Sequence, residues 1–186
     1  LEKENTKISR KDLGFPERKC LLCDNPACQC GRSRKHSIEE LRKKIYGIIW
    51  EEQLQRGVAA EISQALMEEV YTTPKPGLVD REDTGAHTDM NCQTFQKSTE
   101  AIAEDLAAMF EAGYSWEADP KTLFPLLRER GKKTEEKMFV ATGGVNTHKG
   151  IIFTIGILAA AAGISLRNYG KIESEDVCRI SLEMTK

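Results

Sequence analysis

The chain has 186 residues, of which 40% are hydrophobic and 30% charged, and its formal net charge is −2. This composition indicates a soluble globular protein of one domain, or of one domain and a piece of another. The longest apolar run, residues 151–164, is shorter than the ~18 residues of a membrane-spanning helix, and no secretory signal opens the chain. We therefore expect a cytoplasmic protein without membrane contact, and a start at Leu1 rather than Met suggests a piece of a longer polypeptide.

Charge is distributed unevenly along the chain. Residues 1–45 carry 12 Lys/Arg against 7 Asp/Glu, a net of +5, whereas residues 46–186 carry 15 against 22, a net of −7. This asymmetry indicates two units of different origin. The basic part lacks interleaved aromatic residues, so it gives little support to a nucleic-acid partner.

After a polar lead-in over residues 1–19, four of the six cysteines lie close together. Cys20 and Cys23 form a Cys-x-x-Cys pair that can bring two thiolates to one metal ion. The candidates to complete a tetrahedral zinc site are Cys28, Cys30 and His36, and the set we select is Cys20, Cys23, Cys30 and His36. Because this spacing matches no standard zinc module, reduced thiols in a small packed knuckle are the favoured alternative.

Helical periodicity begins immediately after the cysteines. Ser37 and Glu40 form a capping box, and apolar residues then recur at helical spacing. We expect this helix to end or kink at Gly57 and a second amphipathic helix to occupy residues 58–71.

The stretch 73–90 is expected to be irregular. Pro74, Pro76 and several glycines interrupt any helix, and the stretch is too polar for a buried strand. A long irregular connection inside a compact domain is usually functional or disordered. Its groups that bind anions or transfer protons are Lys75, Asp80, Arg81, His87 and Asp89. We expect it to form one wall of a phosphate-binding active site.

The remaining chain is predicted to be helical. Apolar periodicity indicates helices over residues 91–112, 120–130, 132–141, 151–164 and 174–184. Gly113 and Gly131 are expected to end the first two of them, and Asp119 to cap the start of the second. We assign Met138 and Phe153 to the core, and Glu135 and Glu136 to a solvated face, with one of the two glutamates turned inward as a base as the alternative. Period-2 alternation is not sustained anywhere, so the predicted fold is an all-α helical bundle with two irregular loops and a small Cys-rich N-terminal segment.

The second irregular loop covers residues 143–150. Asn146 or Thr147 can cap the following helix, which would aim its free N–H groups, His148 and Lys149 at one point. The order of residues is not that of a Walker loop. A cap on a core helix, without any ligand, is the alternative interpretation.

Together the two loops carry the groups that a nucleotide triphosphate requires. The two lysines and Arg81 can neutralise the phosphates, while Asp80 and Asp89 can hold Mg2+ together with phosphate oxygens. Each residue also has a simpler interpretation: an aspartate in such a loop often caps a turn, and Arg81 can pair with neighbouring acidic residues at the surface.

Several motifs in this part of the chain resemble one enzyme family. The motifs are Lys75-Pro76-Gly77-Leu78-Val79-Asp80-Arg81, Gly85-Ala86-His87-Thr88-Asp89-Met90, Gly144-Val145-Asn146-Thr147-His148-Lys149-Gly150 with Phe153, and Leu127-Arg128 with Gly131, Glu135, Glu136 and Met138. They are similar to the triphosphoribosyl-dephospho-CoA synthases, which serve citrate lyase and, as related proteins, malonate decarboxylase. The resemblance covers about residues 58–163, and residues 82–84 depart from the family in a way that bears only on loop conformation.

The N-terminal part resembles a different enzyme. Residues 12–16, 18–23 and 31–36 are similar to the end of the citrate lyase holo-acyl-carrier-protein synthase, a phosphoribosyl-dephospho-CoA transferase that attaches the finished prosthetic group to the carrier protein. The two activities occur fused in some bacteria. The resemblance therefore implies a junction, from the tail of the first enzyme to the N-terminal portion of the second. It also implies the citrate lyase acyl carrier protein as a partner through the fused transferase.

The resemblance implies an unusual reaction. The 2'-hydroxyl of 3'-dephospho-CoA attacks the ribose C1 of ATP, adenine leaves, and 2'-(5''-triphosphoribosyl)-3'-dephospho-CoA is formed. Such a substitution passes through an oxocarbenium-like state. It needs a group that protonates the leaving adenine, a base near the attacking hydroxyl, and cations on a triphosphate that is held rather than cleaved.

Roles follow for the motif residues as hypotheses. Lys75, Arg81 and Lys149 are assigned to phosphates. Asp80 and Asp89 are assigned to Mg2+ or to the base, and His87 and His148 to acid–base work or substrate hydrogen bonds. The further substrate-binding candidates are Gly77, Gly85, Asn146, Thr147 and Gly150. The competing hypotheses are a zinc-knuckle nucleic-acid binder, a helical interaction module without catalysis, and ordinary phosphoryl transfer that releases ADP or pyrophosphate.

Overall fold

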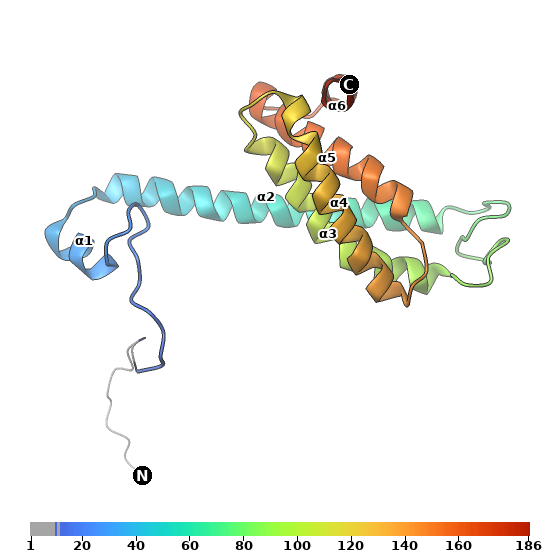
Figure 1. Cartoon of the computed structure of the whole chain (residues 1–186), viewed down its shortest axis with the longest axis horizontal. Coiled ribbons are helices and arrows are strands. Elements are labelled where there is room, and N and C mark those ends of the chain that lie inside the picture. The colour runs from blue at the N-terminus through green and yellow to red at the C-terminus, as the bar shows by residue number, and fades with distance from the viewer. Residues whose placement is uncertain (1–9, 11) are drawn as a thin grey trace, which may run out of the picture. The chain divides into compact units, whose positions relative to one another are not determined.

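A computed structural model describes residue 10 and residues 12–186, apart from the side chains of residues 43, 46, 50 and 51. Within this part of the chain there are helices and no β-strand, which confirms the predicted all-α class. The helices are α1 (Ala27–Ser33), α2 (Ile38–Tyr71), α3 (Cys92–Tyr114), the 3-10 helix η1 (Pro120–Thr122), α4 (Phe124–Thr142), α5 (Lys149–Tyr169) and α6 (Ser174–Thr185). The chain divides into two compact units, Leu1–Glu52 and Gln53–Lys186 (Figure 1).

Unit 1 holds the cysteine-rich segment and the first part of α2. The lead-in expected over residues 1–19 lies partly outside the described residues. A short helix, α1, which the sequence did not predict, carries Cys30 into a buried position. The predicted capping box at the start of α2 is confirmed, because the Ser37 backbone N–H donates to Glu40 Oε2 at 2.8 Å and the Glu40 N–H donates to Ser37 Oγ at 3.1 Å.

Helix α2 is continuous, so the prediction that Gly57 ends or kinks it was wrong. A single glycine in a helix costs only about 1 kcal/mol relative to alanine. That penalty is too small to break a helix whose apolar residues on the C-terminal side are packed. Leu66 and Val70 are buried in unit 2, and Ile62 packs against the same core.

Unit 2 is built around α3. This helix packs against both α4 and α5, and α6 packs against α5 and η1 (Figure 1). Its predicted apolar stripe is confirmed at Ile102, Leu106 and Met109, which are at most 1% exposed. The last predicted helix is also confirmed as α6, with Val177, Ile180 and Met184 buried.

Two glycines allow α3 and α5 to approach backbone to backbone. A Cβ atom on Gly113 would overlap the Ala160 carbonyl, and one on Gly163 would lie 2.6 Å from the Tyr114 nitrogen and closer still to the Phe110 carbonyl. Gly113 therefore lies inside α3 and does not end it. The predicted stop was wrong because the glycine is needed for interhelical packing, which local sequence does not reveal.

Helix α4 is also longer than predicted. Asp119 caps the preceding η1 turn by accepting a hydrogen bond from the Lys121 N–H at 2.9 Å, and α4 then begins at Phe124. Gly131 lies within α4, so the predicted break there was wrong. The helix ends at Gly143, whose φ of 69° is the left-handed conformation that favours glycine.

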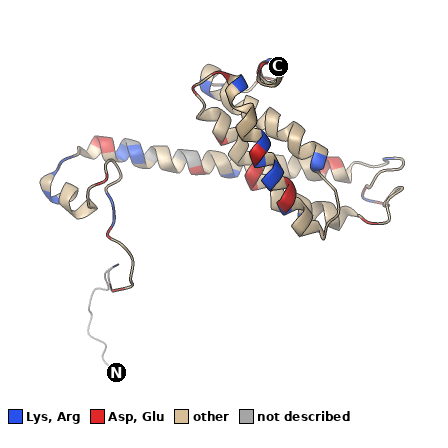
Figure 2. Cartoon of the chain, viewed as in Figure 1, with Lys and Arg blue, Asp and Glu red and all other residues tan. Residues whose placement is uncertain are grey.

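Helix α5 is the central apolar helix of unit 2. It is longer than the predicted run, and it is long and apolar enough to cross a membrane, yet half of its most apolar stretch is buried within the protein. Figure 2 shows almost no charged residue along its ribbon. Burial of Ile152, Ala160 and Ile164 identifies it as a core helix.

Candidate active site

Asp80 organises the first irregular loop. Its Oδ1 accepts hydrogen bonds from the backbone N–H groups of Glu82 at 2.8 Å and Asp83 at 3.0 Å, and its Oδ2 accepts from the Lys75 N–H at 3.0 Å. The Thr73 side chain donates as well, and these bonds hold the pKa of Asp80 far below its ordinary value. The side chain is only 5% exposed. Asp80 is therefore the anchor around which the loop folds.

Gly85 lets the two ends of this loop touch. A Cβ atom there would lie 2.5 Å from the Gly77 carbonyl carbon and from the Leu78 nitrogen, and the φ of Gly85 is 57°. The Ala86 N–H donates to the Gly77 carbonyl at 3.2 Å across the same contact. The two glycines that the sequence assigned to substrate binding thus have a structural reason to be glycine.

We expect Asp80→Asn to loosen this loop. The single oxygen of the new amide can still accept the Glu82 and Asp83 hydrogen bonds. Its NH2 group would then face the Lys75 N–H, so that two donors point at each other. Hydrogen exchange of the Lys75, Glu82 and Asp83 amides should accelerate roughly tenfold or more. Because the folded pKa lies below the unfolded value of ~3.9, the contribution of Asp80 is complete above that pH and is lost as the pH falls further.

Glu82→Gln is the matched control, because only the backbone of Glu82 takes part in the Asp80 network and its side chain is exposed. Unchanged exchange in Asp80→Asn at neutral pH would contradict the anchoring role.

The cations of this loop are held in different ways. Lys75 Nζ donates to the Glu69 carbonyl at 2.8 Å and pairs with its carboxylate at 3.1 Å, so its side chain is only 14% exposed. The Arg81 guanidinium stacks over the Tyr71 ring at 4.8 Å and is exposed. An aromatic contact thus takes the place of the surface pair with a neighbouring acid, which was the simpler interpretation of Arg81, and the side chain stays accessible to solvent.

His87 and Asp89 form a second, accessible pair. His87 Nδ1 lies 3.8 Å from Asp89 Oδ1, with side-chain exposures of 38% and 58%. The His87 N–H donates to the Thr84 carbonyl at 3.0 Å, which fixes the backbone but leaves the ring facing outward. This pair, unlike Asp80, is open to an incoming substrate.

The second irregular loop begins with two glycines of positive φ, Gly143 and Gly144, and ends at the buried His148. Gly143 and Gly144 have φ values of 69° and 93°, as the sequence predicts for an irregular turn. Neither Asn146 nor Thr147 caps α5, which corrects the expectation; the N-cap position is His148, whose side chain makes no capping hydrogen bond. Thr147 instead donates from Oγ1 to Ser98 Oγ at 2.7 Å.

His148 is 1% exposed and held on three sides. Its Nδ1 lies 2.7 Å from Ser98 Oγ, its ring packs edge-on against Phe95 with centroids 5.0 Å apart, and its backbone N–H lies 3.2 Å from Met138 Sδ. Burial lowers the pKa of His148 to about 4, against a smaller opposing effect of the Glu69 carboxylate. The ring is therefore neutral at neutral pH.

The hydrogen-bond chain also sets the tautomer of His148. Ser98 Oγ accepts from Thr147, and the only acceptor that its own hydrogen meets among the described residues is His148 Nδ1, so we assign the donor role in this contact to Ser98. A neutral imidazole that accepts at Nδ1 carries its proton on Nε2. Nε2 is buried and has no partner among the described residues. A buried N–H without an acceptor is costly, so this atom is a candidate donor to a ligand.

Both irregular loops contact the first two turns of α3. Cys92 Sγ donates to the Asp80 carbonyl at 2.8 Å, and Ser98, two turns further on, binds both Thr147 and His148. Figure 1 shows both loops at the same end of unit 2. The two segments, distant in sequence, therefore lie at the same end of unit 2, and their joint binding of one nucleotide stays a prediction.

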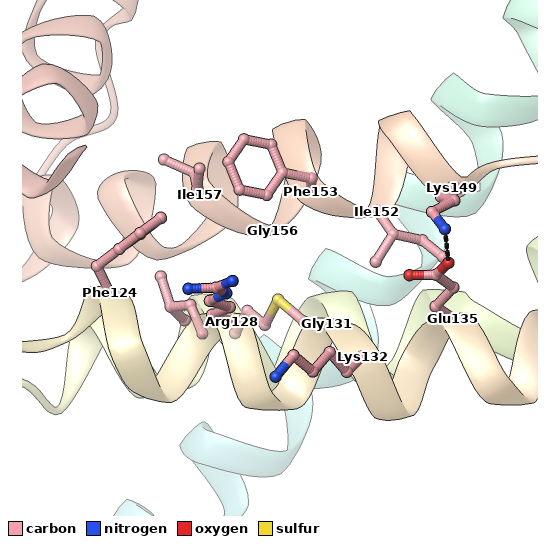
Figure 3. A pocket seen from close by; sticks show the side chains of 12 residues that line it. Phe124, Arg128, Gly131, Lys132, Glu135, Lys149, Ile152, Phe153, Gly156 and Ile157 are labelled. Carbon is pink, nitrogen blue, oxygen red and sulfur yellow. Dashed lines mark ion pairs between the residues drawn. The ribbon is translucent and has the colours of Figure 1, made fainter.

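A small pocket lies beside the second loop, between α4 and α5. Its volume is about 130 Å3. Figure 3 shows charged side chains from both helices beside the apolar side chains of Phe124, Ile152, Phe153 and Ile157. The cations Arg128, Lys132 and Lys149 are exposed, so they lie at the rim of the pocket. Lys149 Nζ pairs there with Glu135 at 2.6 Å, so Glu135 is not on a merely solvated face. Phe153, predicted to be core, is 57% exposed and packs edge-on against Phe124 at the pocket, whereas Met138 is confirmed as core at 0%.

The pocket is smaller than the ~300–1,000 Å3 of typical ligand sites, so it can hold only part of a large substrate. Its lining nevertheless includes six of the residues that the sequence motifs singled out: Leu127, Arg128, Gly131, Glu135, Lys149 and Phe153. Arg128, Gly131, Lys132 and Glu135 follow helical spacing on one face of α4, and this is the signal that could have added Arg128 and Lys132 to the predicted site.

Ser98 and Phe95 were also missed. Ser98 is fully buried within an apolar stripe of α3, and a polar residue at a core position is the sequence signal that could have marked it. Nothing local could have paired it with His148, 50 residues away.

Fold and site together define an all-α protein whose candidate active site lies on two loops and one helix pair and contains lysines and histidines. The profile of the CitG family, described as ATP:dephospho-CoA triphosphoribosyl transferase, matches residues 55–184. The chain therefore belongs to the ATP:dephospho-CoA triphosphoribosyl transferase family. A second profile, CitX, described as apo-citrate lyase phosphoribosyl-dephospho-CoA transferase, matches residues 1–52, so both resemblances expected from the sequence are confirmed.

Individual relatives agree with these matches. The protein named CitXG from Leuconostoc mesenteroides subsp. cremoris is 37% identical over 164 residues, which is 83% of this chain and 35% of that protein. CitXG from Haemophilus influenzae is 33% identical over 168 residues, 90% of this chain and 36% of the relative. The 2-(5''-triphosphoribosyl)-3'-dephosphocoenzyme-A synthase of Escherichia fergusonii is 40% identical over 124 residues, 66% of this chain and 41% of the relative.

The chain thus spans between a third and a half of the length of these curated relatives. No solved structure matches it. The matches favour the enzyme hypothesis over a nucleic-acid-binding or interaction module.

Proposed function

We propose that the protein to which this chain belongs transfers the triphosphoribosyl group of ATP to 3'-dephospho-CoA. In this reaction the 2'-hydroxyl oxygen of dephospho-CoA bonds to the ribose C1, the C1–N9 bond of ATP breaks, and the hydroxyl proton ends on adenine. The observation that carries the proposal is the family match over residues 55–184, which includes both motif loops and the pocket between α4 and α5.

The geometry supports this reaction in two respects. A triphosphate that must be held intact requires cations, and Arg81, Lys149 and the rim residues Arg128 and Lys132 are exposed in unit 2. Lys75 is less available, because it is tied to Glu69; we propose that it supports the loop and contributes positive charge at close range. The backbone at Gly150, with open space around it, lets a phosphate approach the start of α5.

We assign proton transfer to the exposed pair His87 and Asp89 rather than to the buried His148 and Asp80. His87 beside Asp89 can donate to the departing adenine or accept from the attacking hydroxyl. His148 is neutral, with its pKa near 4, so we assign it a hydrogen bond from Nε2 to substrate rather than proton transfer. Asn146 is exposed at the loop surface and is proposed as a further substrate contact.

The expected Mg2+ pair of Asp80 and Asp89 does not fit the geometry. The Asp80 carboxylate already accepts three backbone N–H groups, so it cannot ligate a cation without dismantling the loop. Mg2+ bound to ATP would enter with the substrate, and Asp89 is the accessible carboxylate near it.

We also propose the division of the chain between two enzymes, the protein partner and the cellular location. The 1–49 and 50–186 parts are taken as the tail of the phosphoribosyl-dephospho-CoA transferase and the N-terminal portion of the synthase, with the citrate lyase acyl carrier protein as partner of the former. Substrates such as ATP and dephospho-CoA place the reaction in the cytoplasm.

The test uses the complete polypeptide with ATP, Mg2+ and 3'-dephospho-CoA, and identifies the purine product by chromatography. We expect adenine in an amount equal to the new CoA derivative, and a strong loss of adenine release in His87→Ala. Release of ADP or pyrophosphate without adenine would instead support phosphoryl transfer, and no turnover in the presence of all three components would reject the proposal.

A further inference from the structure

Four potential metal ligands come together in unit 1. Cys20 and Cys23 lie in the loop before α1, Cys30 lies on α1, and His36 directly precedes the cap of α2. Their three sulfur atoms and one ring nitrogen all lie within 4.8 Å of one another. Cys30 is buried and the other three are half-buried, so the cluster is shielded without being sealed.

The spacing of the donor atoms is close to that of a tetrahedral zinc site. Zn–S bonds of about 2.3 Å and Zn–N bonds of about 2.0–2.1 Å place sulfurs about 3.8 Å apart and a sulfur and a nitrogen about 3.6 Å apart. Here Cys23 Sγ lies 3.5 Å from Cys30 Sγ and 3.3 Å from His36 Nε2. The sulfur pair is much too long for a disulfide, whose bond is about 2.05 Å, and all six cysteines are free.

The surroundings of the cluster also suit a zinc ion. The backbone N–H groups of Leu22 and Cys23 hydrogen-bond the Cys20 sulfur, which is the type of outer contact that orients a thiolate ligand. Three thiolates and a neutral imidazole would leave the complex with one net negative charge, and Lys35 Nζ lies 3.8 Å from Cys23 Sγ to compensate it.

The fold holds the ligands with short local bonds. The Cys20 N–H donates to the Asn25 carbonyl at 2.8 Å, and the Ala27 N–H donates to the Arg18 carbonyl at 2.8 Å, closing the loop that carries Cys20 and Cys23. The Lys35 N–H returns to the Cys30 carbonyl at 3.3 Å, which brings His36 back beside α1.

We propose that Cys20, Cys23, Cys30 and His36 bind one structural Zn2+ ion. Four protein ligands fill a tetrahedral shell and leave no position for substrate, so the ion ties the loop, α1 and the start of α2 together without taking part in chemistry. Cys28, also considered from the sequence, is exposed on α1 and is not part of the cluster. The site is independent of the reaction proposed for unit 2.

The first experiment measures bound metal. The chain, purified without a histidine tag and kept reduced with a phosphine, is analysed for zinc by mass spectrometry of its metal content. We expect close to one zinc per chain, and less than about a tenth of that in Cys30→Ser and in His36→Ala. Cys28→Ser is the matched control on the same helix and should keep the full equivalent, as should Cys178→Ser.

A second measurement does not depend on variants that could misfold. Titration of the metal-free, reduced, unaltered chain with Co2+ should give thiolate charge-transfer absorption and the intense visible bands of a tetrahedral site, saturating at one equivalent. Zinc added afterwards should abolish them.

Three outcomes would overturn the proposal. They are an unaltered chain with neither retained zinc nor cobalt bands, a Cys30→Ser variant that retains a full zinc equivalent, and a chain without zinc in which Cys23 and Cys30 are found as a disulfide.

Discussion

His148→Asn in the full-length protein is expected to reduce adenine release about a hundredfold or more while leaving the fold intact. The Oδ1 atom of asparagine occupies nearly the position of Nδ1 and can accept the Ser98 hydrogen, but nothing replaces the Nε2–H donor, which has no partner among the described residues. Loss of one preorganised donor to a reacting group typically costs 10²–10³ in rate, or about 2.7–4 kcal/mol.

His148→Gln is the matched variant for this prediction. Its terminal amide reaches the position of Nε2 and restores a donor there, so activity should recover by about tenfold or more relative to His148→Asn. Equal losses in both variants, or near-normal adenine release from His148→Asn, would remove the Nε2 hydrogen bond from the mechanism. The purine product is measured as before, over a range of ATP concentrations up to saturation, so that kcat and KM effects are separated.

The same residue makes a pH prediction. The folded pKa of His148, about 4, lies below the unfolded value of ~6.5, so the unfolded chain binds the proton first. Stability from this residue is complete above about pH 6.5 and falls as the pH drops towards 4, by up to about 3 kcal/mol. Urea unfolding of His148→Asn should show a flatter dependence over this window than the unaltered protein.

Gly163→Ala is expected to destabilise unit 2 by about 3 kcal/mol or more. The new methyl group would overlap the Phe110 carbonyl and lie 2.6 Å from the Tyr114 nitrogen. Because both are backbone atoms of α3, neither can rotate away, and α3 and α5 must separate. A loss of this size corresponds to a fall of roughly 10 °C in Tm for a domain of this length.

Gly57→Ala is the control for Gly163→Ala. It is the same change inside a helix, but no atom lies within 4 Å of the new Cβ, so the higher helix propensity of alanine should raise stability by about 0.5–1 kcal/mol. Thermal unfolding followed by circular dichroism compares the two. A Gly163→Ala protein within about 0.5 kcal/mol of the original would show that the close approach of α3 and α5 is wrong.

Local sequence patterns predicted most of the helices but placed several of their ends wrongly. The capping box at Ser37 and the last helix were predicted correctly because caps and apolar spacing act over a few residues. Gly57, Gly113 and Gly131 were all interpreted as stops, yet each lies within a helix. The sequence does not distinguish a glycine that ends a helix from a glycine that lets another helix approach. At Gly113 and Gly163 the packed backbone of the facing helix shows that the second role applies.

The sequence by itself determined the all-α class, the two irregular loops, the cysteine-rich start and the family resemblance, because these depend on residue types and short spacings. Only the tertiary structure decided what the polar residues do. In the structure Asp80 accepts hydrogen bonds from three loop amides, and His148 is buried against Ser98. Glu135 pairs with Lys149, and Cys20, Cys23, Cys30 and His36 lie in one cluster. The physical reason is that hydrogen bonding, burial and charge pairing depend on groups far apart in the chain, and their meeting is fixed only when the helices pack.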